Sequence, residues 1–278
     1  GNHGLSSEAL LRLMLAMQFN AFYSGLYPTL ALINHSCRPN CIKLAPRGGK
    51  GSGGGGRSSS EVWATRDIAR GEEITISYLH PSEQSAACRQ RQFLEQHLQP
   101  LGPSPHPPEL EELLPGADPG ELRLLEDRLD GLTATGPDEP GCDVRLGALR
   151  AALDEAQRIC GPRHLVLARV HRMLKEAALS ALSCGAAPAG DLALDLAGWC
   201  HELLATQELL HGACHPDVGE TCTELSDALD FLLSASPKAL FARFPQWSSF
   251  SKASKAQFFL KKKGASIEAL YAAVAHKK

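Results

Sequence analysis

Three features are missing from this sequence, and each absence excludes a class of protein. None of the nine cysteines lies in a Cys-x-x-Cys pair, and the chain is far longer than small disulfide-stapled secreted domains, so we expect free thiols in a reducing compartment. No apolar run reaches the roughly 18 residues that a membrane-spanning helix needs. No cationic leader with a small-residue cleavage site opens the chain, so nothing indicates secretion.

Charge of one sign is also missing overall, because the 278 residues carry a formal net charge of −3. This argues against direct binding of nucleic acid. The charges are nevertheless uneven: residues 109–160 contain 13 acidic and 5 basic residues, and residues 238–278 contain 9 basic and 1 acidic. We interpret both regions, including the lysine run 261–263, as solvated surfaces, with an oppositely charged partner or a nuclear address as the alternative. We expect a cytoplasmic or nuclear protein, or one found in both compartments.

What the sequence does contain is an unusual concentration of polar side chains. The stretch Asn34-His35-Ser36-Cys37-Arg38-Pro39-Asn40-Cys41 directly follows an apolar run, so these side chains need hydrogen-bond partners or a ligand. A strand is expected over residues 72–78, and its alternation puts Ile74, Ile76 and Tyr78 on one inward face. The Tyr78 hydroxyl then needs a buried partner.

Several chemistries compete for the stretch from Asn34 to Cys41. A Cys37 nucleophile activated by His35 is disfavoured, because a nucleophile and its base usually come from different elements. Structural zinc needs four ligands, and Cys88 and His80, the nearest additions to His35, Cys37 and Cys41, show no paired spacing. A polar turn with satisfied side chains is the reading that the residues alone favour.

The first part of the chain predicts short elements. Ser6 is expected to cap a buried helix, because the apolar residues lie on almost every side of it: Leu10, Leu11, Leu13, Met14, Leu15 and Met17. Short strands are expected over residues 42–44 and 61–65, and a turn over residues 69–71. Residues 46–60 form a Gly/Ser-rich segment without the order of a phosphate-binding loop, so we predict a disordered loop.

The second part has a different character. Residues 100–120 hold seven of the 18 prolines, which predicts an extended linker. Beyond it, three apolar faces recur at helical spacing: Val144, Leu146, Leu149, Leu153, Ala156 and Cys160; Leu192, Leu196, Trp199, Leu203, Thr206 and Leu210; Val218, Cys222, Leu225, Leu229 and Leu232. With residues 165–183 between the first two, this is the layout of antiparallel helical hairpins. Trp199 is expected in the core, and Phe244, Trp247 and Phe250 around a terminal turn.

A resemblance decides between the alternatives left open above. The order Asn20-Ala21-Phe22, Gly25-Leu26-Tyr27-Pro28, Asn34 to Cys41 and Arg70-Gly71-Glu72-Glu73-Ile74-Thr75-Ile76-Ser77-Tyr78 resembles the C-terminal half of SET domains, most closely the SET and MYND (SMYD) family. The resemblance covers roughly residues 6–99, with a weaker likeness at His211–Gly219. It implies an α+β protein: a partial SET β-fold in residues 1–99, the linker 100–120, and a helical-repeat-like (TPR-like) domain in residues 121–278.

The resemblance also implies an activity, which is methyl transfer from S-adenosylmethionine to the side chain of a protein lysine. By position, Asn20, Asn34 and His35 would hold the cofactor, and Tyr78 would be the catalytic tyrosine. Phe22 would lie beside the lysine channel. The partner would be a protein substrate, histone or non-histone, and no metal is required for this transfer.

The sequence departs from the family in two places. The glycine-containing cofactor segment and the MYND zinc module that precede this half in the family are not in the sequence, so we expect the C-terminal portion of a SMYD-type protein. A Cys-x-Cys-x-x-Cys cluster is also missing after Tyr78, where residues 89–98 are expected to be helical. Cys37 is then a small buried thiol, and one wall of the cofactor pocket is expected to be missing. The alternative function is a non-catalytic interaction module with a degenerate SET remnant.

Overall fold

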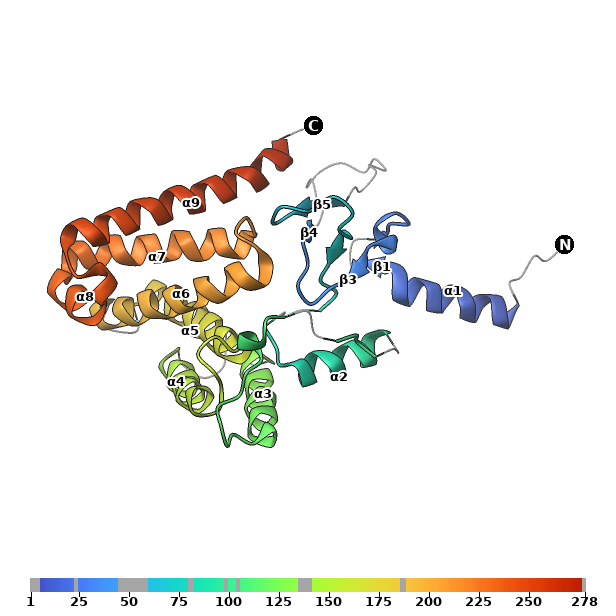
Figure 1. The fold of residues 1–278 in the computed structure, drawn as a ribbon, viewed down its shortest axis with the longest axis horizontal. Helices are drawn as coiled ribbons and strands as arrows, with labels where there is room; N and C mark the ends of the chain where they lie inside the picture. Colours follow the sequence, from blue (N-terminus) through green and yellow to red (C-terminus); the bar gives the residue numbers. More distant parts are fainter. Residues whose placement is uncertain are drawn as a thin grey trace.

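The computed structural model describes residues 6–22, 25–44, 60–79, 83–97, 100–103, 106–134, 142–185 and 189–276, and only the backbone of 18–22, 25–26, 134, 142 and 273–276. Within these ranges, one helix is followed by short strands and loops up to residue 79, and helices dominate afterwards (Figure 1). The predicted α+β class, with short strands followed by a mainly helical part, is confirmed. The Gly/Ser loop predicted at 46–60 lies outside the described residues, apart from its last residue.

The first helix, α1 (Ser7–Asn20), begins as expected but is not buried. The Ala9 amide donates to the Ser6 hydroxyl oxygen at 3.1 Å. The prediction of a buried helix is wrong, because Leu11 is 56% and Met14 60% exposed, and α1 extends away from the other elements (Figure 1). An apolar surface all around a helix indicates a need for neighbours, and the described elements do not supply them.

Three pairs of short strands follow. They are β1 (Ala21–Phe22) with β2 (Gly25–Leu26), antiparallel; β3 (Asn34–His35) with β6 (Thr75–Ile76), parallel; and β4 (Cys41–Leu44) with β5 (Glu61–Ala64), antiparallel. A 3-10 turn, η1 (Leu30–Leu32), precedes β3. Their shared core is small: Leu30, Cys41 and Ile76 are buried, and Tyr27, Ile33, Val62, Ile68 and Tyr78 pack against them. The strands predicted at 42–44 and 61–65 are confirmed.

The strand predicted over residues 72–78 is shorter than expected. The turn at 69–71 forms as predicted, with Gly71 at φ +86°, but regular pairing covers only Thr75 and Ile76. Ile74 is 50% exposed, so its predicted inward position is wrong, whereas Ile76 is buried. Glu72 and Glu73, which precede the strand, do not join the regular pairing, because their polar groups bond to the Asn40 side chain instead.

The helical part begins beside the strands and continues to the end of the described chain. Its elements are α2 (Ala86–His97), η2 (Pro108–Leu110), α3 (Pro119–Ala134), α4 (Cys142–Ile159), α5 (Leu165–Ser183), α6 (Ala189–His211), α7 (Pro216–Ala235), α8 (Pro237–Arg243), η3 (Pro245–Trp247) and α9 (Phe250–His276). Each helix from α3 to α7 packs on the next, and α9 lies along α7 (Figure 1). None of the described helices is long and apolar enough to span a bilayer.

The core of these helices follows the predicted faces closely. Every residue of the faces predicted from 192 to 210 and from 218 to 232 is buried, including Trp199. On the predicted face of α4, Val144 is exposed and Leu153 is half-buried, and the other residues are buried. Phe244 and Trp247 are buried with ring centroids 4.9 Å apart, as predicted, but Phe250 is exposed and its predicted packing is wrong.

The proline-rich segment between the two parts makes ordered contacts along its described residues. It contains the short η2 turn and a bridge between Leu113 and Cys160, and the Leu110 side chain is fully buried. The segment therefore packs against the helices that it leads to. The limits predicted for the individual domains stay predictions.

Candidate functional site

The pairing of β3 with β6 brings together two parts of the sequence that are 41 residues apart. Asn34 lies opposite Thr75 and His35 opposite Ile76. The backbone amide of Tyr78, just beyond β6, donates to His35 Nδ1 at 3.0 Å. The structure therefore brings Asn34, His35 and Tyr78 to one edge of the strand region.

Asn40 holds this arrangement in place. The residue is only 1% exposed. Its Nδ2 donates to the Glu72 carboxylate at 2.9 Å and to the Glu73 carbonyl at 2.8 Å. Its Oδ1 accepts from the Thr75 amide at 2.9 Å. One amide thus satisfies three polar groups of the segment leading into β6. Sequence reasoning assigned Asn40 no role, although an Asn placed between Pro and Cys next to a core was a usable signal.

The Tyr78 phenol is half-buried and has found a partner, as predicted. Its hydroxyl donates to the Ile33 carbonyl oxygen at 2.5 Å, directly before β3. Burial raises the pKa of Tyr78 above its ordinary value, so the phenol stays protonated at neutral pH and acts as a hydrogen-bond donor.

Both ring nitrogens of His35 are engaged within the protein. Because Nδ1 accepts the Tyr78 amide, the proton of the neutral ring lies on Nε2, which is 3.4 Å from Cys37 Sγ. Burial, with the nearby His97 next in importance, lowers the pKa of His35 to about 4. The ring is therefore neutral at physiological pH, and it positions the main chain at Tyr78.

Cys37 is a small buried thiol, as predicted. The short distance to His35 is the geometry that a nucleophilic pair would need, but the electrostatics oppose one. Burial raises the pKa of Cys37 while the pKa of His35 is lowered, so neutral thiol and neutral imidazole are the favoured forms. Among the described residues, Cys37, Cys41, Cys88 and His35 form no cluster with metal-ligand spacing.

Helix α2 places two aromatic rings against His35 and Tyr78. The Phe93 ring lies 5.0 Å from the His35 ring and is stacked at 6.4 Å on the Tyr78 ring. His97, one turn later, lies 5.2 Å from Tyr78. The helix was predicted, but the position of its Phe93 and His97 face against the site was not. Their i, i+4 spacing on one helical face was the available signal.

The other predicted site residues are described less completely. Asn34 is exposed, and its Nδ2 donates to the Glu73 carboxylate at 2.6 Å. Asn20 is the last residue of α1, and Phe22 lies in β1 opposite Gly25. The side chains of Asn20 and Phe22 lie outside the described part of the structure.

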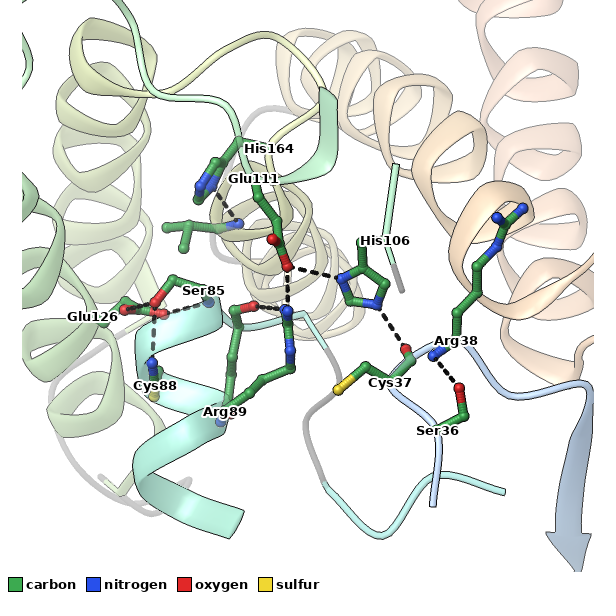
Figure 2. Close-up of polar contacts among 12 residues, drawn as sticks. Ser36, Cys37, Arg38, Ser85, Cys88, Arg89, His106, Glu111, Glu126 and His164 are labelled. Carbon is green, nitrogen blue, oxygen red and sulfur yellow. Dashed lines mark hydrogen bonds and ion pairs between the residues drawn. The ribbon is translucent and has the colours of Figure 1, made fainter. Parts of the chain in front are cut away.

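A buried polar chain connects this site to the linker and to α2 (Figure 2). His106 Nε2 donates to the Cys37 carbonyl at 2.7 Å, and its Nδ1 lies 3.2 Å from the Glu111 carboxylate. Glu111 is also paired with the buried Arg89 of α2. The loop after β3 is thus anchored from the proline-rich segment, which sequence reasoning treated only as a linker.

Comparison with known families assigns this region. The SET domain model matches residues 9–79, which contain the paired strands β3 and β6 and Tyr78. A SET domain is present in this part of the chain. The match to the SET domain covers about a quarter of the sequence. No curated protein matches the chain closely enough to be reported as a relative.

SET domains form a family of protein-lysine methyltransferases, and they typically bind S-adenosylmethionine. In this chain, two cavities of about 710 and about 360 Å³ lie elsewhere, the first among α4, α5, α6 and α8 and the second between α2 and α3. Asn34, His35 and Tyr78 line neither of them. Of these three residues, Asn34 is exposed to solvent, and His35 and Tyr78 are half-buried.

Proposed function

We propose that the chain is a SET-type protein-lysine N-methyltransferase of the SMYD kind that uses S-adenosylmethionine. One observation carries the proposal: the parallel pairing of β3 with β6 joins Asn34 and His35 to Tyr78, with the Tyr78 amide 3.0 Å from His35. These are the residues to which the family resemblance assigns the cofactor and the catalytic phenol. The SET domain match over residues 9–79 supports the same reading.

The residues present fit such a cofactor. The exposed Asn34 amide offers both donors and an acceptor, which suits an ammonium group or an adenine edge, and Glu73 beside it provides a negative charge. The His35 ring is occupied, so we propose that His35 contributes through its main chain and through the order it gives to Tyr78. Asn20 is proposed to complete the cofactor contacts.

S-adenosylmethionine supplies an activated methyl group bound to a positive sulfur. The work left to the protein is to position two reactants and to exclude water. The protonated Tyr78 phenol is proposed to orient the substrate lysine nitrogen, with Phe22 beside its channel. Phe93 and His97 pack against the Tyr78 ring. The substrate would be a histone or a non-histone protein, met in the cytoplasm or the nucleus.

A matched pair of variants tests the role of Tyr78. Tyr271 also donates its hydroxyl to a main-chain carbonyl, that of Cys214, at 2.8 Å. Tyr78→Phe and Tyr271→Phe each remove one such bond, which costs about 1 kcal/mol. We expect similar small decreases in Tm for both variants and a loss of methyl transfer of at least about 100-fold in Tyr78→Phe alone. Unchanged turnover in Tyr78→Phe would refute the assigned role.

The second candidate function is a non-catalytic interaction module. The exposed apolar surface of α1 and the exposed Phe258 and Phe259 on α9 favour this candidate. Calorimetric titration of S-adenosylmethionine into the chain separates the two functions. Saturable heat that Asn34→Ala reduces supports the enzyme, and an absence of binding supports the interaction module.

A further inference from the structure

Three side chains of types that bind metal ions meet close to the contact between residues 9–79, called the SET region below, and the helices. Glu83 lies just before α2, His211 is the last residue of α6, and Asp217 lies in the first turn of α7. One ligand atom from each lies within 4.8 Å of the others. Nothing in the proposed methyl transfer uses these residues.

The two oxygens of Glu83 have different surroundings. Glu83 is only 2% exposed, and its Oε2 lies 3.5 Å from Arg172 Nε. Its Oε1 instead faces His211 Nε2 at 3.9 Å. One oxygen of a buried carboxylate is therefore directed at an imidazole nitrogen, while the other faces a guanidinium.

The neighbouring His215 packs against the site, and its Nδ1 lies 3.6 Å from Asp217 Oδ1. Its ring is stacked on His211 with centroids 4.4 Å apart. Its Nδ1 accepts from the Asp217 amide at 3.2 Å, which holds the first turn of α7. Asp217 itself is half-exposed, so it forms the side from which an ion would enter.

We infer that Glu83 Oε1, His211 Nε2 and the Asp217 carboxylate bind a divalent transition metal of the zinc class. One imidazole with two carboxylates suits such an ion, and water would complete the coordination. Ligands of a tetrahedral zinc ion lie roughly 3.3 Å apart. The three ligand atoms, which lie within 4.8 Å of one another, must therefore approach by up to about 1.5 Å. Arg172 keeps Oε2 and offsets part of the added negative charge of the ligands.

The position of the site gives it a structural consequence. The α6–α7 turn is docked on the SET region, where the Cys214 amide donates to the Thr65 carbonyl at 3.1 Å. Glu83 follows the SET match of residues 9–79 by four positions, and His211 and Asp217 come from α6 and α7. A bound ion therefore joins the two parts of the molecule, and it should raise the unfolding temperature of the whole chain.

The test uses the full 278-residue chain, stripped of metal and titrated with Co²⁺ and then Zn²⁺. Co²⁺ bound by nitrogen and oxygen gives visible d–d absorption, whereas thiolate ligands add intense near-ultraviolet bands. Glu83→Gln and Asp217→Asn are compared with Asp227→Asn, which changes an exposed carboxylate elsewhere on α7. Circular dichroism checks that each variant is folded, and Asp217→Asn decides if Glu83→Gln is not.

We expect one equivalent of Co²⁺ without thiolate bands, displaced by Zn²⁺, and a rise in Tm on metal addition. Asp227→Asn should bind as the parent chain does, and the two ligand variants should bind at least about tenfold more weakly. Absence of binding, equal binding by all variants, or thiolate bands from one of the cysteines would each overturn the inference. These readouts do not involve methyl transfer, so they are independent of the proposed function.

Discussion

The SET region and the helices after it are held together by different interactions. Among the residues that the structure describes there, three buried side chains, Leu30, Cys41 and Ile76, form the core around the paired strands, and the side chain of Asn40 adds polar contacts. The helices instead share one continuous apolar cluster that extends from α3 to α9. Directional hydrogen bonds fix a single geometry, while apolar burial contributes most of the free energy of folding. The polar contacts therefore fix the geometry of the residues around Tyr78, and the apolar cluster of the helices contributes most of the stability.

The largest expected effect is a loss of apolar packing in the helices. Leu229 on α7 is fully buried, and Leu229→Ala should lower the free energy of unfolding by about 3 kcal/mol, within the usual range for buried leucines. Leu124→Ala on α3 is the control, since Leu124 is 66% exposed, and it should change stability by less than about 0.5 kcal/mol. Denaturant midpoints measure both. Equal effects would contradict the helical core described above.

A somewhat smaller effect, confined to the SET region, is expected for Asn40→Ala. The change leaves the Thr75 amide and the Glu73 carbonyl without their side-chain partner, which costs about 2 kcal/mol. Hydrogen exchange should accelerate in residues 72–78 and stay unchanged in α7. Asn34→Ala, which removes one exposed bond, is the control. Equal acceleration in α7 would show that the two parts do not differ in the way proposed.

The junction between the parts can be weakened by one methyl group. Gly212 has φ +91°, and a Cβ there would lie 2.7 Å from the Thr65 carbonyl oxygen. Gly185 also has a positive φ, +65°, but a Cβ there meets nothing within 4 Å. Both Ala variants pay the backbone strain of about 1 kcal/mol, and Gly212→Ala should lose at least about 1 kcal/mol more from the contact. Equal midpoints in thermal unfolding would argue against tight docking of the turn.

The same contrast explains how much of the fold the sequence could predict. The faces of α6 and α7 were predicted residue by residue, because a helix that packs on its neighbours in sequence repeats its apolar positions every three or four residues. The exposure of α1 was not predictable in this way. The composition of α1 shows that the helix has an apolar surface. The spacing of its apolar residues does not indicate which partner covers that surface.

The candidate site was predictable in its residues but not in its connections. The motif pointed to Asn34, His35 and Tyr78. The strands β3 and β6 are nevertheless too short to show an alternation of apolar and polar residues, so their parallel pairing could not be predicted. The contacts of Phe93 with His35 and of His106 with Cys37 join segments 58 and 69 residues apart. Such long-range contacts depend on the packed fold, so no local sequence pattern predicts them.

The smallest effect concerns a feature that both parts share. His35 in the SET region and His164 before α5 each accept a backbone amide at Nδ1, from Tyr78 at 3.0 Å and from Val166 at 3.2 Å. Burial lowers the pKa of both residues to about 4. Protonation would remove the acceptor, so each contact requires a neutral ring.

His164→Asn tests this on the helical side, because Asn also caps helices well and does not titrate. Between pH 6.5 and 4 the unfolded chain binds a proton at His164 that the folded chain does not, so the folded state loses stability as the pH falls. Asn should match His at pH 7 and gain about 1 to 2 kcal/mol relative to it at pH 5. Urea midpoints at the two pH values measure the difference, and parallel pH profiles for the two proteins would show that His164 is not held neutral.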